Sequence, residues 1–268
     1  MKADEEVAQL TGLSWDERER LFFWGCIWLG NRRLRDPQEI LPSGLLQIYQ
    51  PQRPIHPFTL DPSSVVFEDE NLLVVYKPPN LNSVQSPFSD LDNLSHGVQG
   101  YLEQQQGRNP GVGYQVNAVH RLDMPAQGLV HFGKNKEAEK KMFALFQNRR
   151  IRKIYWALLP PGEEIPGNIH FIRDELDWQG KVKRACSFLK YEKDLGDKEQ
   201  WIASPLTGRP HQLRKHFATY LKPIIGDVMY GDYEIPAVLK LASVYSRFIH
   251  PFTGKMLEIH RVDSEFLN

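Results

Sequence analysis

Cysteine is scarce in this chain of 268 residues, since only Cys26 and Cys186 are present and they lie far apart in the sequence. This spacing excludes a disulfide framework and a zinc cluster of the CxxC type, and it is typical of a reducing compartment. Long hydrophobic runs are also lacking, because the longest, residues 21–30, is well short of the ~20 residues that cross a bilayer. The chain begins with acidic residues rather than with the cationic start of a secretory signal. We therefore expect a cytoplasmic protein that does not span a membrane.

The common nucleotide, acyl-transfer and zinc motifs are missing as well. There is no GxGxxG after an expected strand, no GxxxxGK[ST], no GxSxG and no HExxH. His211 and His216 are five residues apart, so on a helix they would point to different faces, unlike the i, i+4 pair of a zinc site. The sequence therefore predicts no metal site.

Charge is balanced overall but unevenly distributed. The chain has 33 basic and 33 acidic side chains, with a composition of 41% hydrophobic and 25% charged residues that is ordinary for a globular protein. Residues 120–160, however, hold nine basic and three acidic side chains. This segregation fits a face that binds phosphates, and it is equally compatible with charges scattered over a solvated surface.

Proline marks the expected division of the chain. The proline-rich residues 50–62 interrupt both helices and central strands, which predicts a linker between a small α+β module, residues 1–60, and a larger domain, residues 61–268. In the module we expect a helix that begins at the Ser14 capping box and strands at residues 26–29, 32–35 and 45–49.

The larger domain contains more strand patterns than helix patterns. Strands are expected at residues 64–67, 72–76, 114–119, 128–132, 153–159, 168–173, 184–192, 200–204 and 255–260, and helices at residues 136–148 and 210–220. Because the strands do not alternate regularly with helices, the pattern predicts an α+β fold with a mixed, largely antiparallel sheet and flanking helices.

Asp123 is the first candidate for chemistry, since it lies in a loop between two apolar strands with Arg121 two positions before it. One interpretation is a surface ion pair, worth about 0–1 kcal/mol. The other is a desolvated carboxylate that a guanidinium keeps ionised, so that it can serve as nucleophile or base. A second source of guanidinium groups is the segment 207–214, a glycine turn that leads into an expected helix.

Six sequence blocks, in order, resemble those of RluA-type pseudouridine synthases. His120-Arg121-Leu122-Asp123 followed by Gly128-Leu129-Val130 is similar to the HRLD…SGLL signature of that family. The other blocks are VVYKPP at residues 74–79, KIYWA at 153–157, TGRPHQLR at 207–214, KPIIGDVMYG at 222–231 and HPF at 250–252. One departure is that residues 124–127 read MPAQ where the family usually has a Thr-Ser pair before the glycine.

The resemblance implies a pseudouridine synthase fold and a role for several residues. It makes Asp123 the catalytic carboxylate, Arg214 its ion-pair partner, Tyr155 the aromatic that packs on the target uracil, and Arg121 a group that reaches into the RNA where the base leaves. From the residues alone, Tyr155 is equally a core aromatic and Arg214 a charge on a helix surface. We also expect substrate contacts from the remaining polar groups of these blocks and from the basic run that precedes Tyr155, namely His120, Arg209, His211, Arg149 and Arg150.

The reaction implied is the isomerisation of uridine, in which the bond from uracil to ribose breaks, the base turns, and a bond forms through carbon 5. The base must first leave its stack. This chemistry needs no metal and no organic cofactor. We therefore expect an RNA pseudouridine synthase, a monomer, with rRNA or tRNA as its partner. The alternatives are a non-catalytic RNA-binding or RNA-folding factor and a glycoside hydrolase, which would require a second positioned carboxylate.

The N-terminal module has a fainter resemblance of its own. Residues 25–31 and 41–45 are similar to parts of the αL-type RNA-binding module that precedes many of these synthases. A purely structural role for the module is equally compatible with the sequence.

Overall fold

The computed structural model describes residues 1–42, 46–107, 115–162, 168–231 and 238–267. The chain divides into two compact units, of which the first comprises Met1–Leu60 with Val84–Val112, and the second Asp61–Ser83 with Gly113–Asn268. The chain therefore changes unit near residue 61, where the proline-rich linker ends, and again on either side of residues 84–112.

The first unit consists of helices and a three-stranded antiparallel sheet. Its elements are α1 (Ala3–Thr11), α2 (Trp15–Trp24), β1 (Ile27–Leu29), β2 (Arg32–Arg33), β3 (Leu46–Ile48) and α3 (Leu94–Gln105), with strand order β2-β1-β3. The Ser14 capping box is present, because the Ser14 backbone N–H donates to Glu17 at 2.8 Å. Leu45, the first residue of an expected strand, lies outside the described residues. Helices α1 and α3 were not predicted.

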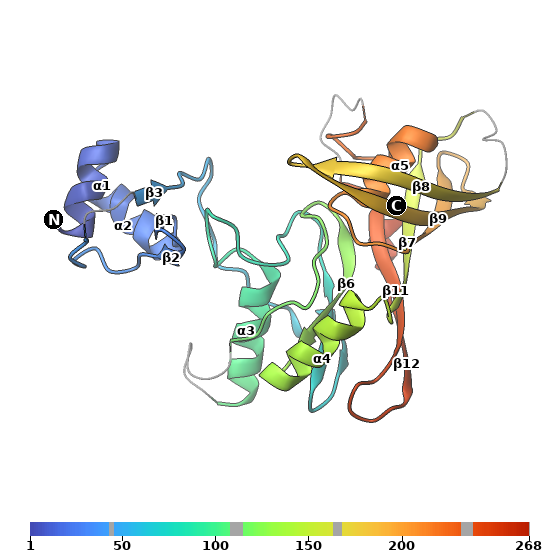
Figure 1. Cartoon of the computed structure of the whole chain (residues 1–268), viewed down its shortest axis with the longest axis horizontal. Coiled ribbons are helices and arrows are strands. Elements are labelled where there is room, and N and C mark those ends of the chain that lie inside the picture. The colour runs from blue at the N-terminus through green and yellow to red at the C-terminus, as the bar shows by residue number, and fades with distance from the viewer. Residues whose placement is uncertain (43–45, 108–114, 163–167, 232–237, 268) are drawn as a thin grey trace. The chain divides into compact units, whose positions relative to one another are not determined.

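The second unit is built on one mixed sheet of nine strands in the order β4-β5-β6-β11-β7-β10-β9-β8, with β12 paired to β11 (Figure 1). The strands are β4 (Val65–Glu68), β5 (Leu72–Lys77), β6 (Gln127–Gly133), β7 (Arg152–Leu159), β8 (Ile169–Trp178), β9 (Lys181–Asp194), β10 (Glu199–Pro205), β11 (Leu241–Ile249) and β12 (Met256–His260). Short 3-10 helices, η1 (Pro62–Ser64) and η2 (Ser264–Phe266), lie near its two ends in sequence. The expected α+β class with a largely antiparallel sheet is confirmed.

Two helices pack on this sheet. Helix α4 (Lys136–Gln147) contacts β6, and α5 (Gln212–Tyr220) contacts β9 and β10. The Asn135 side chain caps α4 by accepting the backbone N–H of Ala138 at 2.9 Å. Ala138 and Met142 are fully buried on the face of α4 that packs against β5 and β6. The predicted helix over residues 136–148 is thus confirmed, one residue shorter at its end.

The loop that carries the HRLD motif begins earlier than the sequence suggested. In place of the strand expected at residues 114–119, the described part of this segment makes a single bridge between Ala118 and Phe132, and Tyr114 lies outside the described residues. Residues 121–123 have no regular secondary structure. The position of Asp123 therefore depends on side-chain contacts rather than on a strand.

Gly128, at the end of this loop, is required by a close approach of two strands. Among the strand pairs that the structure describes, only β6 and β11 run parallel, with Gly128 opposite Ser243. Gly128 has a φ of 118°, and a Cβ there would lie 2.3 Å from the backbone oxygen of Ser243. A side chain would force the two strands apart just after the motif loop.

Replacement of Gly128 by alanine is expected to lower the free energy of unfolding by more than about 3 kcal/mol, because the new Cβ meets backbone atoms that cannot rotate away. The matched control is Gly180→Ala, where φ is 75° but nothing lies within 4 Å of the added Cβ. That change should cost only about 1 kcal/mol of backbone strain. Urea denaturation of both variants measures the difference, and equal losses would contradict the close approach of β6 and β11.

Candidate active site

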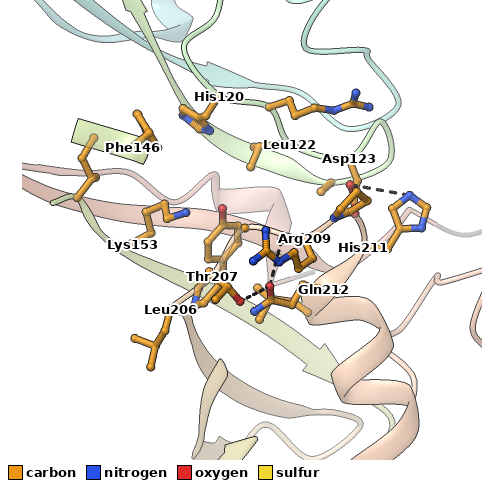
Figure 2. Close-up of a pocket in the computed structure, with 18 of the residues that line it drawn as sticks. His120, Leu122, Asp123, Phe146, Lys153, Leu206, Thr207, Arg209, His211 and Gln212 are labelled. Atoms are coloured by element: carbon orange, nitrogen blue, oxygen red, sulfur yellow. Dashed lines mark hydrogen bonds and ion pairs between the residues drawn. The ribbon is translucent and has the colours of Figure 1, made fainter. Parts of the chain in front are cut away.

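A pocket of about 560 Å³ opens beside the HRLD loop in the second unit. Its walls come from residues 120–123, from the end of α4, from the start of β7 and from residues 205–213 (Figure 2). Segments far apart in the sequence therefore meet here, and three of the resembling blocks contribute to one cavity.

Asp123 lies at this pocket with its side chain 21% exposed. Its Oδ2 is 3.8 Å from Nη1 of Arg214, and its Oδ1 is 3.9 Å from Nε2 of His211. These distances allow electrostatic attraction but are longer than hydrogen bonds. The carboxylate is therefore close to a permanent cation while its oxygen lone pairs remain available to another group.

Arg214 makes its hydrogen bonds to a different carboxylate, that of Asp227. Its Nε and Nη2 donate to the two oxygens of Asp227 at 2.8 and 2.6 Å, and the side chains of Arg214 and Asp227 are 3% and 0% exposed. The expected proximity of Arg214 to Asp123 is found, but Asp227 is the primary partner. Burial lowers the pKa of Arg214, whereas the hydrogen bonds and charge of Asp227, together with Asp123, raise it above its ordinary value.

Asp227 is a residue that sequence reasoning missed. It belongs to the KPIIGDVMYG block, to which no role was given, and its Oδ1 also accepts the backbone N–H groups of Met229 and Tyr230, both at 3.2 Å. The acid of that block was the available signal. Its two carboxylate oxygens bind the Arg214 guanidinium, which lies near Asp123.

Two further side chains hold the backbone on either side of Asp123. Ser83 exchanges hydrogen bonds with the backbone of Leu122, donating to its oxygen at 3.1 Å and accepting its N–H at 3.0 Å. The Lys77 amine donates to the backbone oxygens of Pro78, Leu81 and Met124 at 2.7–3.0 Å. Three acceptors match the three N–H donors of an ammonium group. Lys77 and Ser83 were not predicted as site residues.

Tyr155 lies on β7 with its side chain in the pocket wall and is 8% exposed. Burial raises the pKa of its phenol to about 12; a hydrogen bond from Ser243 lowers it and the charge of Asp123 raises it further. The phenol is therefore neutral at physiological pH. It presents an aromatic surface in the same cavity as the Asp123 carboxylate.

The segment of residues 207–214 is organised by Gln212. Its amide oxygen accepts the Thr207 hydroxyl at 2.7 Å and the Arg209 backbone N–H at 3.1 Å, as Figure 2 shows. Its amide nitrogen donates to Cys186 and Ser187 of β9 at 2.8 and 2.9 Å. This clamp fixes the turn from β10 into α5. Gln212 was not predicted as a site residue.

His211 and Arg209 both line the pocket. His211 has a left-handed backbone, with φ of 53°, and its Nδ1 lies 2.9 Å from the Tyr230 hydroxyl. Burial lowers the pKa of His211, the negative charge of Asp123 opposes this, and the charge of Arg214 adds to it. Arg209 donates through Nε to the backbone oxygen of Arg184 at 2.9 Å.

The remaining expected residues are distributed over the rim. His120 and exposed Arg121 line the pocket, as does Arg149, whereas exposed Arg150 is outside its lining. Arg149 has a φ of 55° at the end of α4, a position where glycine is usual. Such a backbone in a side-chain-bearing residue is uncommon and is found at functional sites.

Two residues of the MPAQ segment, residues 124–127, are buried in the structure. Gln127 is buried and accepts the Tyr76 hydroxyl at 3.1 Å, and Ala126 is buried at the pocket wall.

Over the described ranges there is no group of three or more His, Cys, Asp or Glu that could hold a metal ion. No described helix is long and apolar enough to cross a membrane.

The buried pair of Arg214 and Asp227 should dominate local stability. We expect Asp227→Leu to lower the free energy of unfolding by about 3–5 kcal/mol, because it leaves a buried guanidinium short of its partner. The double variant Arg214→Met with Asp227→Leu should lose less than the sum of the two single variants. Urea denaturation of the four proteins measures this coupling, and strictly additive losses would contradict it.

The comparisons with known proteins agree with this geometry. The RNA pseudouridylate synthase family matches residues 71–219. The dual-specificity RNA pseudouridine synthase RluA of Vibrio vulnificus is 30% identical over an alignment of length 215 that covers 74% of this chain and 80% of that protein. The ribosomal large subunit pseudouridine synthase D of Zymomonas mobilis is 28% identical over an alignment of length 284 that covers 96% of this chain and 88% of that protein.

A solved structure has the same fold. Human RNA Pseudouridylate Synthase Domain Containing 1 superposes with a TM-score of 0.57 at 25% sequence identity, over 75% of this chain and 83% of that one. The family match covers more than half of the chain and includes the HRLD loop, Tyr155 and Arg214. This chain therefore belongs to the RluA-type family of RNA pseudouridine synthases, and it is an isomerase that acts on RNA.

Proposed function

We propose that this enzyme isomerises a specific uridine in structured rRNA or tRNA, with Asp123 as the catalytic carboxylate. The observation that carries the proposal is the position of Asp123, at a pocket of about 560 Å³ and 3.8 Å from a buried guanidinium that another acid already binds. The nearby cation attracts the negative charge that a catalytic carboxylate carries. An ionised oxygen with free lone pairs is what the reaction needs.

The chemistry rearranges one nucleotide without adding or removing atoms. The bond between uracil N1 and ribose C1′ breaks, the base turns, and C5 bonds to C1′, after which the C5 proton leaves and N1 is protonated. Asp123 would act by attack on the ribose, by attack on the uracil, or by removing the ribose 2′ proton. All three routes use the same ionised carboxylate in a pocket that receives the extruded base.

The walls of the pocket suit an extruded uracil. The Tyr155 ring offers a flat surface on which the base would stack, an interaction worth about 1–3 kcal/mol per base. Arg121 is exposed at the same pocket, and we assign it to the space in the RNA that the base vacates. His120, Arg209 and His211 also line the cavity and would contact the nucleotide or its flanking phosphates.

The substrate class is proposed from the relatives and from charge. One relative is described as a tRNA pseudouridine synthase and another as a large-subunit ribosomal enzyme, which supports rRNA or tRNA for this chain. Arg149 at the pocket and neighbouring Arg150 would bind phosphates beside the target. We also propose that the enzyme acts as a monomer in the cytoplasm, which agrees with its two free cysteines.

Mapping of pseudouridine in cells tests the proposal. Deletion of the gene should remove pseudouridine from at least one rRNA or tRNA position, and expression of the wild-type protein should restore it. Expression of Asp123→Asn to the same level should not restore it, because the amide carries no charge and little nucleophilicity. If deletion removes no site, or if Asp123→Asn restores the lost site, the proposal fails.

Salt dependence tests the phosphate contacts. The double variant Arg149→Gln with Arg150→Gln should bind the substrate RNA more weakly and should reduce the slope of log affinity against log salt by about 1–2, since each phosphate contact contributes about 0.7–0.9. Lys255→Gln is the control, because Lys255 is exposed and outside the pocket lining. An unchanged slope in the double variant would show that this run does not touch phosphate.

A further inference from the structure

A chain of three polar side chains connects the interior of the sheet to the wall of the active site. His131 on β6 and Ser246 on β11 are each 1% exposed, and neither lines the pocket. The Ser246 hydroxyl is 2.9 Å from Nε2 of His131, and Nδ1 of His131 is 2.9 Å from Nε2 of His120. His120 is part of the pocket wall and lies three residues before Asp123.

The backbone of His131 decides where the protons lie. Its N–H donates to Nε2 of His120 at 3.2 Å, and its carbonyl oxygen accepts the N–H of Val119 at 3.1 Å. A backbone N–H can only donate, so Nε2 of His120 is an acceptor and carries no proton. The His120 ring is therefore neutral with its proton on Nδ1.

The donor and acceptor of each remaining hydrogen bond are then defined. Because Nε2 of His120 accepts, Nδ1 of His131 must be the donor of the 2.9 Å contact. The neutral His131 ring then accepts through Nε2 from Ser246. Burial lowers the pKa of His120 well below its ordinary value and that of His131 to about 3, with further lowering by the charge of Lys153, which agrees with two neutral rings.

Packing removes the remaining freedom of these rings. The His120 ring stacks on Phe146 of α4 with centroids 4.2 Å apart and an interplanar angle of 24°. The His131 ring contacts Phe146 and Phe248 edge-on, at 5.4 and 5.7 Å. His120 is thus held by a hydrogen bond at its edge and by an aromatic ring on its face.

We infer that His131 is a positioning residue, which holds His120 through its Nδ1–H and thereby fixes the start of the loop that carries Asp123. This inference rests on the proposed catalytic role of Asp123. The loop has contacts at three alternate residues, with His131 at His120, Ser83 at Leu122 and Lys77 at Met124. Only the first of these involves a side chain of the loop itself, and its loss would let the motif shift.

Two substitutions of His131 test the inference, because each places an amide near only one of the two imidazole nitrogens. Asn at residue 131 places an amide near the position of Nδ1 and can still donate to His120, whereas Gln places its amide near Nε2 and reaches toward Ser246 instead. We expect His131→Asn to keep the single-turnover rate within about threefold of the wild type. His131→Gln should lower it about 10- to 100-fold, since small misplacements of a reacting group have effects of that size.

The assay uses total RNA from the deletion strain, labelled with tritium at uracil C5, and follows tritium release at saturating enzyme. The enzyme concentration for half-maximal rate should change less than the maximal rate, because Arg149 and Arg150, which are proposed to bind phosphate, lie outside the motif loop. Circular dichroism and thermal melting show whether each variant is folded. If one is not, the ring tautomers of the wild-type protein decide, and a proton on Nε2 of His120 or His131 would overturn the inference.

The outcomes separate this inference from the proposed function. Asp123→Asn in the same assay should release no tritium, and if it does release tritium, the proposed function fails. If Asp123→Asn is inactive but His131→Asn and His131→Gln have equal rates, only the positioning role is overturned. Nitrogen-15 spectra of the histidine rings give an independent readout, in which both His120 and His131 should carry their proton on Nδ1. A proton on Nε2 of either ring would contradict this assignment of donors and acceptors.

Discussion

The active site depends on a guanidinium whose charge is already matched. Arg214 is buried, and its hydrogen bonds go to both oxygens of Asp227. Because this pair is satisfied, Arg214 does not close onto Asp123 and remains 3.8 Å from it. At that distance the cation still attracts the Asp123 carboxylate but does not occupy its lone pairs. An ion pair formed with Asp123 alone would hold the carboxylate charged and also unavailable.

The second constraint is the set of contacts that fix the position of the loop carrying Asp123. Asp123 lies in a loop without regular secondary structure, so its position is determined by contacts from β5, β6 and the segment that contains Ser83. The loop ends at Gly128, where β6 and β11 approach so closely that no side chain fits. Because sites on loops are less precise than sites on strands, the supporting contacts are what keep Asp123 in a defined position.

Local patterns in the sequence predicted the local parts of this structure. Helix α4 has apolar residues at helical spacing and an asparagine cap, and the Ser14 capping box is formed as expected. The motif blocks brought Asp123, Tyr155, Arg121 and Arg214 into one candidate site, and the structure places all but Arg214 in the pocket lining. Arg214 is outside the pocket lining and lies 3.8 Å from Asp123, with which it forms an ion pair.

The parts that were not predicted depend on partners distant in sequence. Nothing near Lys77 indicates that its amine would bind the oxygen of Met124, and nothing near His131 indicates a contact with Ser246. The pairing of Arg214 with Asp227 has the same origin. Helix α3 has Leu94, Val98 and Leu102 at helical spacing, and all three are buried. The prediction missed this signal in a segment whose two internal glycines, Gly97 and Gly100, lower its helix propensity.

The central claim is that a uracil turned out of its RNA occupies the pocket between the Asp123 carboxylate and the Tyr155 ring. A crystal structure of the Asp123→Asn variant with the RNA stem that carries its mapped uridine tests this most directly. The account predicts an extruded base stacked on Tyr155, with its ribose beside residue 123. A target base that stays stacked in the RNA, or that is bound elsewhere on the protein, would contradict it.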